Sequence, residues 1–282
     1  AVCLLPYSKS STRAQHDIDS LRELALRIAR LKGLPFGGIM DPTRDEPAVR
    51  RRDPLYVVAP DTLLSDEARA LGITRRTDLF GGVVAHRVHA TKAIVHPVWP
   101  DCTVLPAGWR EGLPQRVAGV ALPGYSAFCK RDVRSAALAM LAAGPVRLKR
   151  CDGVGGLGQA VVCTTAELDG VLDRLLADAV EQEGVVCERD LARPVTLSVG
   201  QADIGACRIS YCGVQRQTTD NRGALVYGGS DLLVVRGEFE DLLRLALPAA
   251  MRLAVRQARY FDTAVGEWLP ELIVSRNNYD VI

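Results

Sequence analysis

A lysine that stands just before a glycine-rich segment is the feature of this sequence with the clearest chemical use. Lys149 lies in Pro145–Arg150, which is typical of a strand, and it is followed closely by Gly153, Gly155, Gly156 and Gly158. Gln159–Cys163 predicts a second strand. A glycine hairpin can offer backbone N–H groups to phosphates, and a lysine on the adjoining strand can reach phosphate oxygens as a point charge. The pattern indicates a triphosphate site; the alternative is a surface hairpin with a lysine at the end of its strand.

The glycines spell G-x-G-x-x-G, which several nucleotide sites share, and the surrounding elements distinguish these sites. A dinucleotide-binding turn needs a helix after the glycines, whereas a strand is predicted here. A protein-kinase loop has its lysine on a later strand, but no lysine follows Lys149 in the chain. These two readings therefore fail, and a site whose lysine precedes the loop remains.

Two more features of the sequence lie on either side of the glycine hairpin. Thr91-Lys92 precedes the hairpin, and Gly184–Glu188 is an apolar strand that ends in an acid and leads into a short linker. The order of Lys92, Lys149, glycine loop and Glu188 resembles the ATP-grasp superfamily, from about residue 90 onward. The resemblance implies that ATP and Mg²⁺ bind and that both lysines hold phosphates under the loop. It also implies that adenine is held by backbone groups near Cys187, Glu188, Arg189 and Leu191.

Several longer strings are similar to one uncharacterised bacterial family of ATP-grasp-like proteins, a domain of unknown function. These strings are Asp78–Val84, Ala90–Ile94, Thr196–Gln201, Val226–Leu232 and Asn278–Val281. This second resemblance covers nearly the whole chain. It supports the fold and the nucleotide but supplies no substrate.

The sequence leaves two readings of the magnesium site that the superfamily resemblance implies. ATP-grasp enzymes usually hold magnesium with an acid on one strand and a Glu-x-Asn pair on the next, and such hard oxygen ligands suit this ion. Asp262 could be the first acid, followed by Asn277 or Asn278, but no Glu then stands at the expected position. We favour Asp280 as the first acid, with the Glu strand beyond the last residue, so that the chain would end before the site is complete. An ordinary loop acid is the alternative for Asp280.

Other candidates for the site are weaker. Gln215 and Arg216 lie on or just after a strand where the superfamily often places groups that meet the γ-phosphate or the acyl group. An arginine there could stabilise charge on the transferred phosphoryl group, and a cross-strand surface pair is the alternative. We interpret His86, His89 and His96 as packing or surface groups.

The resemblance implies an ATP-dependent ligase. ATP would phosphorylate a small-molecule carboxylate, and an amine or another nucleophile would displace phosphate from the acyl phosphate. Such catalysis is mostly positioning and charge neutralisation. The rival hypothesis is a nucleotide-binding module without turnover that serves as a sensor or an assembly component. The sequence names neither the acid nor the amine.

Predicted elements before residue 90 form an α/β unit that precedes these motifs. The pattern predicts a helix over Asp17–Leu31, a loop over Leu34–Asp53, a strand over Leu55–Ala59 and a short helix capped by Ser65. Strands that alternate with helices predict a parallel sheet. We therefore expect a Rossmann-like N-terminal domain over residues 1–89.

The remaining residues, 90–282, form the expected ATP-grasp region, with a small lid subdomain at about 145–191. Asp132–Ala143 predicts a helix, and Glu238–Tyr260 predicts another that Pro248 breaks or kinks. Apolar runs predict strands at 195–199, 206–214 and 231–235. The expected fold class is α/β (α+β), an ATP-grasp fold in two domains. The chain length of 282 residues suits two domains at roughly 150 residues each.

Composition excludes several other classes of protein. Hydrophobic residues make up 48% and charged residues 24%, which argues against disorder. The net charge of +2 gives no reason to expect nucleic acid, and no stretch approaches the roughly 20 apolar residues of a membrane span. The eight cysteines form no C-x-x-C pair and predict a reducing, cytoplasmic compartment. A sheet edge left open by a missing strand would favour association, so a homo-oligomer is possible.

Overall fold

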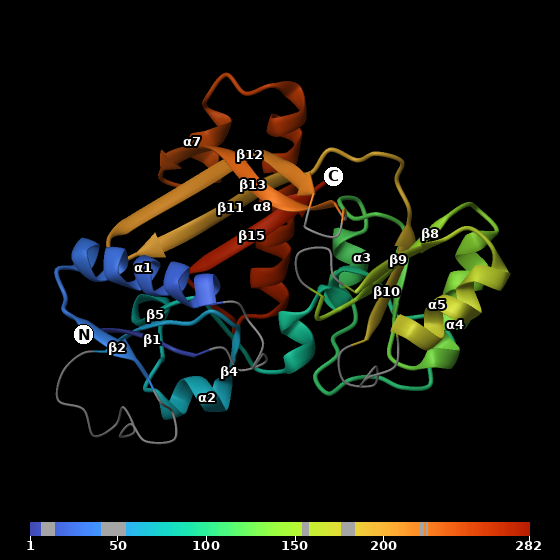
Figure 1. Cartoon of the computed structure of the whole chain (residues 1–282), viewed down its shortest axis with the longest axis horizontal. Helices are drawn as coiled ribbons and strands as arrows, with labels where there is room; N and C mark the ends of the chain where they lie inside the picture. The colour runs from blue at the N-terminus through green and yellow to red at the C-terminus, as the bar shows by residue number, and fades with distance from the viewer. Residues whose placement is uncertain (7–14, 41–54, 154–157, 176–183, 220–222, 224) are drawn as a thin grey trace.

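The computed structural model describes residues 1–6, 15–40, 55–153, 158–175, 184–219, 223 and 225–282. In Figure 1 these residues form two lobes. The smaller lobe holds the strands and helices between residues 124 and 189, and the larger lobe holds the N-terminal elements together with the last strands and helices.

The N-terminal unit is a parallel sheet between helices. Its strands run in the order β2 (Phe36–Ile39), β1 (Val2–Leu4), β3 (Tyr56–Val58) and β5 (Leu79–Phe80). Helix α1 (Gln15–Lys32) packs on one face, because its apolar side is buried against β1 and β3. Helix α2 (Ser65–Ala70) contributes to the core on the other face. The predicted parallel α/β unit is thus present.

Two local predictions in this unit are wrong. The segment expected to be a loop contains β2, where Gly37 serves close packing: a Cβ on Gly37 would lie 2.5 Å from Sγ of Cys3. Ser65 does not cap α2, because Leu64 occupies the N-cap position and the Ser65 hydroxyl donates to the carbonyl of Val84. Both errors arise from contacts with distant strands.

The small sheet is antiparallel, with α4 (Lys130–Leu141) and α5 (Thr165–Leu175) on one face. Its order is β7 (Gly124–Ala127), β10 (Val185–Arg189), β8 (Val146–Arg150) and β9 (Gln159–Val162). β7 and α4 lie before the predicted lid subdomain of 145–191. Leu148 and Cys187 pair across β8 and β10 and are fully buried against the helices. Because side chains alternate along a strand, Lys149 and Glu188 point to the opposite face.

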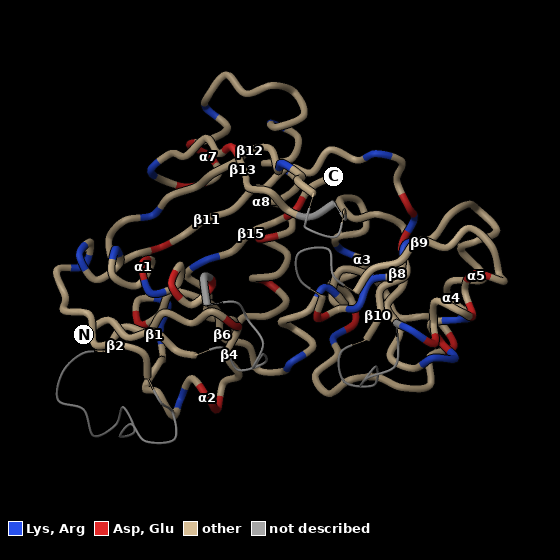
Figure 2. Tube along the Cα trace, in the orientation of Figure 1, with Lys and Arg blue, Asp and Glu red and all other residues tan. Residues whose placement is uncertain are grey.

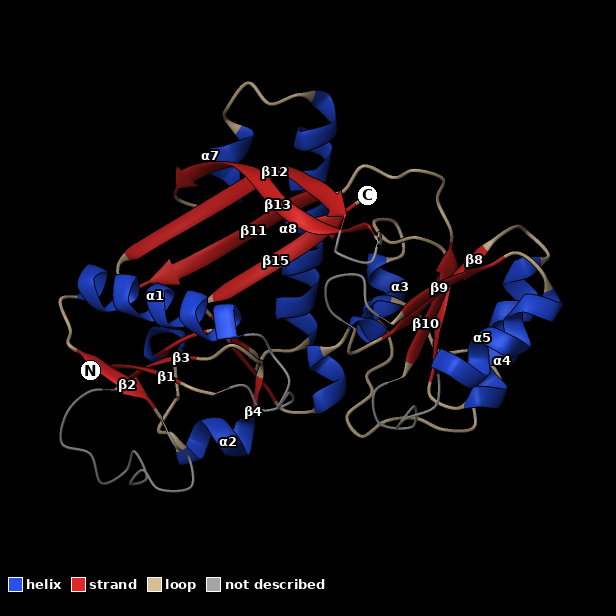
Figure 3. Ribbon diagram, in the orientation of Figure 1, coloured by secondary structure: helices blue, strands red, loops and turns tan. Residues whose placement is uncertain are grey.

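The large sheet is also antiparallel, and Figure 3 shows its long strands across the larger lobe. Its order is β13 (Leu225–Arg236), β12 (Cys207–Thr219), β11 (Leu197–Ile204) and β15 (Arg276–Val281). One face packs on α7 (Phe239–Leu243) and α8 (Ala249–Trp268), with Pro248 as the N-cap of α8. The expected break at Pro248 is confirmed, and it separates two helices.

The far end of the large sheet joins it to the N-terminal unit. Ala202 and Ile209 pack into the same core as α1 and β1. A second small sheet, β14 (Ile273–Val274), β6 (Gly82–Val84) and β4 (Leu63–Leu64), links the two regions again. The buried hydroxyl of Ser275 accepts from the amide of Gly81, 3.0 Å away, and donates to the carbonyl of Leu79 at 2.7 Å. Residues just before β15 therefore belong structurally to the N-terminal unit.

The remaining elements are short. They are η2 (Arg76–Asp78), η3 (Arg87–Ala90), η4 (Lys92–Val95) and α3 (Leu113–Val117). η2 belongs to the N-terminal unit, while the other three lie between that unit and the small sheet along the chain. Basic and acidic residues are interspersed along the described trace (Figure 2). No helix among the described residues is long and apolar enough to cross a membrane.

Candidate active site

Lys149 and Glu188 form an ion pair on the face of the small sheet that carries no helices. Lys149 lies on β8 opposite Val186, so Glu188 is its diagonal neighbour on β10. The Glu188 side chain is only 9% exposed, and that of Lys149 is 21% exposed. Burial disfavours the charged form of Glu188, but contact with His96 and attraction to Lys149 outweigh it, so the pKa of Glu188 lies below its ordinary value. The Glu188 carboxyl is therefore ionised at neutral pH.

Lys92 joins this site from η4, and its ammonium donates to two backbone carbonyls. One is that of Gly153, at 2.8 Å, and the other is that of Arg150, at 3.3 Å. Burial lowers the pKa of Lys92 below its ordinary value. The lysine therefore meets the end of β8 at the point where the glycine segment begins.

Two of the four predicted glycines can be placed. Gly153 follows the turn after β8, and its amide donates to the Arg150 carbonyl. Gly158 accepts from the Arg150 amide at 2.9 Å and has a φ of +70°, which suits glycine. Gly155 and Gly156 lie outside the described residues. The described residues thus form both ends of a strand–glycine–strand hairpin, as predicted.

The linker after β10 is fixed at its start. The amides of Arg189 and Asp190 donate to the carbonyls of Pro123 and Pro145, each at 3.0 Å, and Arg147 pairs with Asp190 at 2.7 Å. Cys187 and Glu188 pair with strands on both sides. The Leu191 amide is the first along the linker that lacks an acceptor among the described residues.

A second polar row lies on the large sheet, around Asp280. Oδ1 of Asp280 accepts from Gln215 Nε2 at 2.7 Å and from Asn278 Nδ2 at 2.9 Å. Gln215 also donates to the buried hydroxyl of Ser198, 2.8 Å away. The Tyr211 hydroxyl donates to Asn278 Oδ1 at 3.1 Å. All donors to Asp280 meet one oxygen, and the described residues give its Oδ2 no hydrogen-bond donor.

A glycine makes this row possible. Tyr211 on β12 reaches Asn278 on β15 across Gly200 of β11. A Cβ on Gly200 would lie 2.4 Å from the Tyr211 hydroxyl oxygen and 2.4 Å from the Asn277 carbonyl oxygen. Because Gly200 has no side chain, the Tyr211 hydroxyl can donate to Asn278, and the Asn278 amide in turn donates to Asp280.

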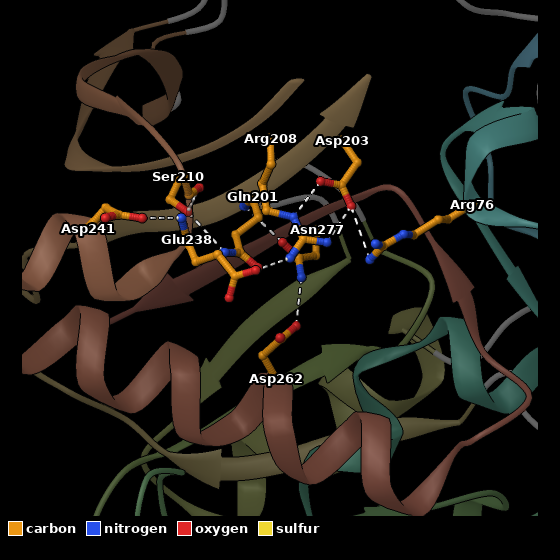
Figure 4. A network of polar contacts seen from close by, with 10 residues as sticks. Arg76, Gln201, Asp203, Arg208, Ser210, Glu238, Asp241, Asp262 and Asn277 are labelled. Atoms are coloured by element: carbon orange, nitrogen blue, oxygen red, sulfur yellow. Dashed lines mark hydrogen bonds and ion pairs between the residues drawn. The ribbon is translucent and has the colours of Figure 1, made fainter. Parts of the chain in front are cut away.

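The structure does not bring Asp262 and Asp280 together. Asp262 lies on α8, beneath the other face of β15 (Figure 4). Its Oδ1 accepts from Asn277 Nδ2 at 2.7 Å and from the Tyr279 hydroxyl at 2.6 Å. Burial raises the pKa of Asp262 above its ordinary value, although these two hydrogen bonds oppose the rise. Since Asn277 and Tyr279 alternate with Asn278 and Asp280, the two acids belong to separate environments.

The polar network near Asp262 consists of ion pairs that join elements of the fold to one another. Arg208 pairs with Asp203 through two contacts of 2.5 and 2.8 Å and with Glu238 at 2.6 Å. Asp203 also meets Arg76 of the N-terminal unit at 3.5 Å (Figure 4). Among the described residues, no three His, Cys, Asp or Glu side chains form a group that could hold a metal ion.

Gln215 and Arg216 point to opposite faces of β12. Gln215 contacts Asp280, as described above, whereas Arg216 pairs with Asp231 of β13 through Nε at 2.7 Å. Both members of that pair are about two-thirds exposed. The structure therefore brings Gln215 to the candidate site and places Arg216 in a cross-strand surface pair.

Sequence reasoning missed two residues that contact the site. His96 was interpreted as a packing or surface group, yet it is buried with Nε2 3.4 Å from Glu188 Oε2. Its position only four residues after Lys92 was the available signal. Tyr211 was not singled out, although it shares one face of its strand with Gln215.

Solved ligases share this fold. The D-alanine–D-alanine ligase of Bacillus anthracis aligns with a TM-score of 0.56 and 12% identity, over 100% of this chain and 82% of that one. D-alanyl-alanine synthetase A of Vibrio cholerae aligns with a TM-score of 0.58 and 12% identity, over 99% of this chain and 84% of that one. A D-cycloserine synthetase aligns with a TM-score of 0.55 and 14% identity, over 100% of this chain and 86% of that one. Another structure of the Bacillus anthracis ligase is complexed with ATP. The fold is therefore the ATP-grasp fold, as the order of motifs predicted.

Sequence comparison agrees with the second resemblance. No curated protein matches the sequence. Residues 4–282 match the family described as protein of unknown function (DUF3182), and the chain therefore belongs to that family.

Proposed function

We propose that this protein binds ATP between its two antiparallel sheets and uses it to join a small-molecule carboxylate to an amine. The observation that carries the proposal is the meeting of Lys92, Lys149 and Glu188 at the mouth of the glycine hairpin, in the fold of ATP-dependent ligases. The ATP-bound relative supports the nucleotide, at 11% identity and a TM-score of 0.55.

The two lysines would hold the phosphates. An ammonium has three N–H donors. Lys149 uses one on Glu188, so two remain for phosphate oxygens. Lys92 now donates to carbonyls at the start of the glycine segment, and phosphate oxygens would compete for the same donors. Adenine would meet the linker at the Leu191 amide.

Asp280 fits a magnesium ion, and Asp262 does not. Asp280 is an exposed carboxylate whose Oδ2 has no donor among the described residues, while neutral donors orient its Oδ1. Mg²⁺ usually takes one or two carboxylates, substrate phosphates and waters, so one acid with ATP is a reasonable partial set. Bound there, the ion would neutralise charge on the transferred phosphoryl group.

The proposed reaction has two steps. An oxygen of the substrate carboxylate attacks the γ-phosphorus, and the bond between that phosphorus and the ADP oxygen breaks. The amine then attacks the acyl carbon, loses a proton and expels phosphate, which carries away one carboxylate oxygen. Lys92 and Lys149 would steady the phosphates during the first step, which depends on positioning and charge.

An oxygen-transfer experiment tests this proposal. The full chain is incubated with ATP, Mg²⁺ and ¹⁸O-labelled carboxylates, including amino acids, in the presence of ammonia or small amines. Phosphate that contains one ¹⁸O, together with ADP, is the expected product. Pyrophosphate and AMP would contradict the acyl-phosphate route.

A matched pair of variants controls the experiment. Lys149→Met removes the ammonium at the site, whereas Lys130→Met removes one from an ion pair with Asp173 on the outside of the small lobe. Only the first should abolish labelled phosphate. ATP binding measured by calorimetry without any phosphate release would favour the non-catalytic nucleotide-binding module instead.

A further inference from the structure

Two cationic or potentially cationic side chains approach the two oxygens of one buried carboxylate. Lys149 contacts Oε1 of Glu188, and Nε2 of His96 lies 3.4 Å from Oε2. The His96 side chain is 4% exposed and that of Glu188 is 9% exposed. Such burial leaves the carboxylate little solvent to replace a lost partner, and an unpaired buried charge is costly.

The fold holds His96 in this place through β7. The hydroxyl of Ser126 on β7 donates to the Ala93 carbonyl at 2.7 Å, and the Ser126 amide donates to the Pro97 carbonyl at 2.8 Å. The segment around His96 is therefore bonded to the strand on both sides of the histidine. A Cβ on Gly124 would lie 3.0 Å from Cε1 and Nδ1 of the ring. The bare backbone at Gly124 leaves room for the imidazole to reach Glu188 over β7.

Lys92 is the first residue of η4 and His96 directly follows that helix, so one short segment supplies both a direct phosphate candidate and the contact to Glu188. We propose that His96 is a positioning residue: it fixes the Glu188 carboxylate and thereby directs the Lys149 ammonium toward the phosphates. This inference rests on the proposed ATP binding. With His96 removed, Glu188 can rotate about its side-chain bonds and take Lys149 with it.

The alternative is that His96 only fills space. The two roles differ in what a donor-bearing substitute does. In His96→Gln the side-chain amide can place an N–H near the position of Nε2, whereas His96→Leu fills similar volume without a donor. A space-filling role predicts that leucine is at least as good as glutamine. His89→Leu is the matched control, because His89 is also buried but bonds to the Gly108 carbonyl at 2.8 Å.

Two measurements test the proposal, one without nucleotide. The chain has five lysines, so ¹⁵N labelling of lysine side chains gives few NMR signals, and Lys149→Arg assigns that of Lys149. We expect His96→Leu to shift or broaden the Lys149 signal, and His96→Gln and His89→Leu to leave it in place. Calorimetry with ATP and Mg²⁺ should show an affinity about tenfold lower for His96→Leu, the order expected for losing a hydrogen bond to a charged group, and nearly wild-type affinity for the other two.

The outcomes separate this inference from the proposed function. If the wild type binds no ATP, the proposed function fails, and the Lys149 signal still decides whether His96 positions the lysine. An unchanged Lys149 signal in His96→Leu would overturn the inference, as would equal ATP affinities for the leucine and glutamine variants. If His96→Leu does not fold, His96→Asn replaces it, because its shorter amide keeps the polarity but cannot reach Oε2; the same results are then required of it.

Discussion

Replacing Lys92 by methionine tests whether this lysine organises the hairpin before any nucleotide arrives. Methionine keeps an unbranched apolar side chain but removes the ammonium. The Gly153 carbonyl then loses the one hydrogen-bond donor that the described residues give it. The Arg150 carbonyl still accepts a hydrogen bond from the Gly153 amide. A lost hydrogen bond to a charged group costs about 1.5–3 kcal/mol. Relief from burying the cation offsets part of this cost, so we expect the free energy of unfolding to fall by about 2 kcal/mol.

Urea denaturation measures this change, with Lys130→Met as the control. Lys130 pairs with Asp173 at an exposed position, and exposed pairs contribute about 0–1 kcal/mol. Within a cooperative unfolding transition, the difference appears as a shift in midpoint at constant slope. If Lys92→Met proved as stable as Lys130→Met, then the contacts of Lys92 with the two carbonyls would not hold the hairpin, and the reasoning would be refuted.

Three other predictions concern the two sheets. Lys149→Met should weaken ATP binding by roughly tenfold to a hundredfold, because a charge-assisted contact is lost; calorimetry showing equal affinity would remove Lys149 from the site. Tyr211→Phe should loosen Asn278 and weaken Mn²⁺ binding in the presence of a non-hydrolysable ATP analogue by about threefold to tenfold, the order expected for one neutral hydrogen bond, and an unchanged Mn²⁺ titration followed by electron paramagnetic resonance would contradict it. Burial raises the pKa of Asp262, so the folded chain binds the proton of this carboxyl more tightly than the unfolded chain does. The contribution of Asp262 to the free energy of unfolding therefore falls as pH rises from about 3.9 through the folded pKa. Asp262→Asn should lessen that fall between pH 4 and 7 in urea midpoints, and an unchanged pH dependence would argue against the buried acid.

The hairpin of the small sheet could be predicted because its signals are local. Val146–Lys149 alternate between buried and partly buried positions, and the glycines mark the turn without reference to the rest of the chain. The cap of α5 shows the limit of such signals. The Thr164 hydroxyl accepts from the Glu167 amide at 3.3 Å, as the spacing suggests, but Glu167 returns to the amide of Cys163 rather than to that of Thr164.

Contacts between distant segments account for what the sequence did not reveal. β7 is a short Gly-Tyr-Ser-Ala run with no strong strand pattern, and it exists because it pairs with β10. Gly124 and Gly200 do not mark turns; each leaves space for a side chain from another element, His96 in one case and Tyr211 in the other. Such a glycine can be recognised only when the partner that crosses it is known.

The partners of the two acids give a physical reason to assign them different roles. Glu188 already neutralises Lys149 and is nearly buried, so it has little charge to offer a metal ion and can serve to aim the lysine. Asp280 is exposed, its donors Gln215 and Asn278 are neutral amides, and it forms no ion pair with a described residue. A carboxylate oriented by neutral donors keeps its full charge for a cation. In the proposed complex, phosphate would therefore meet positive charge from the small sheet, and a metal ion held by Asp280 would meet negative charge from the large sheet.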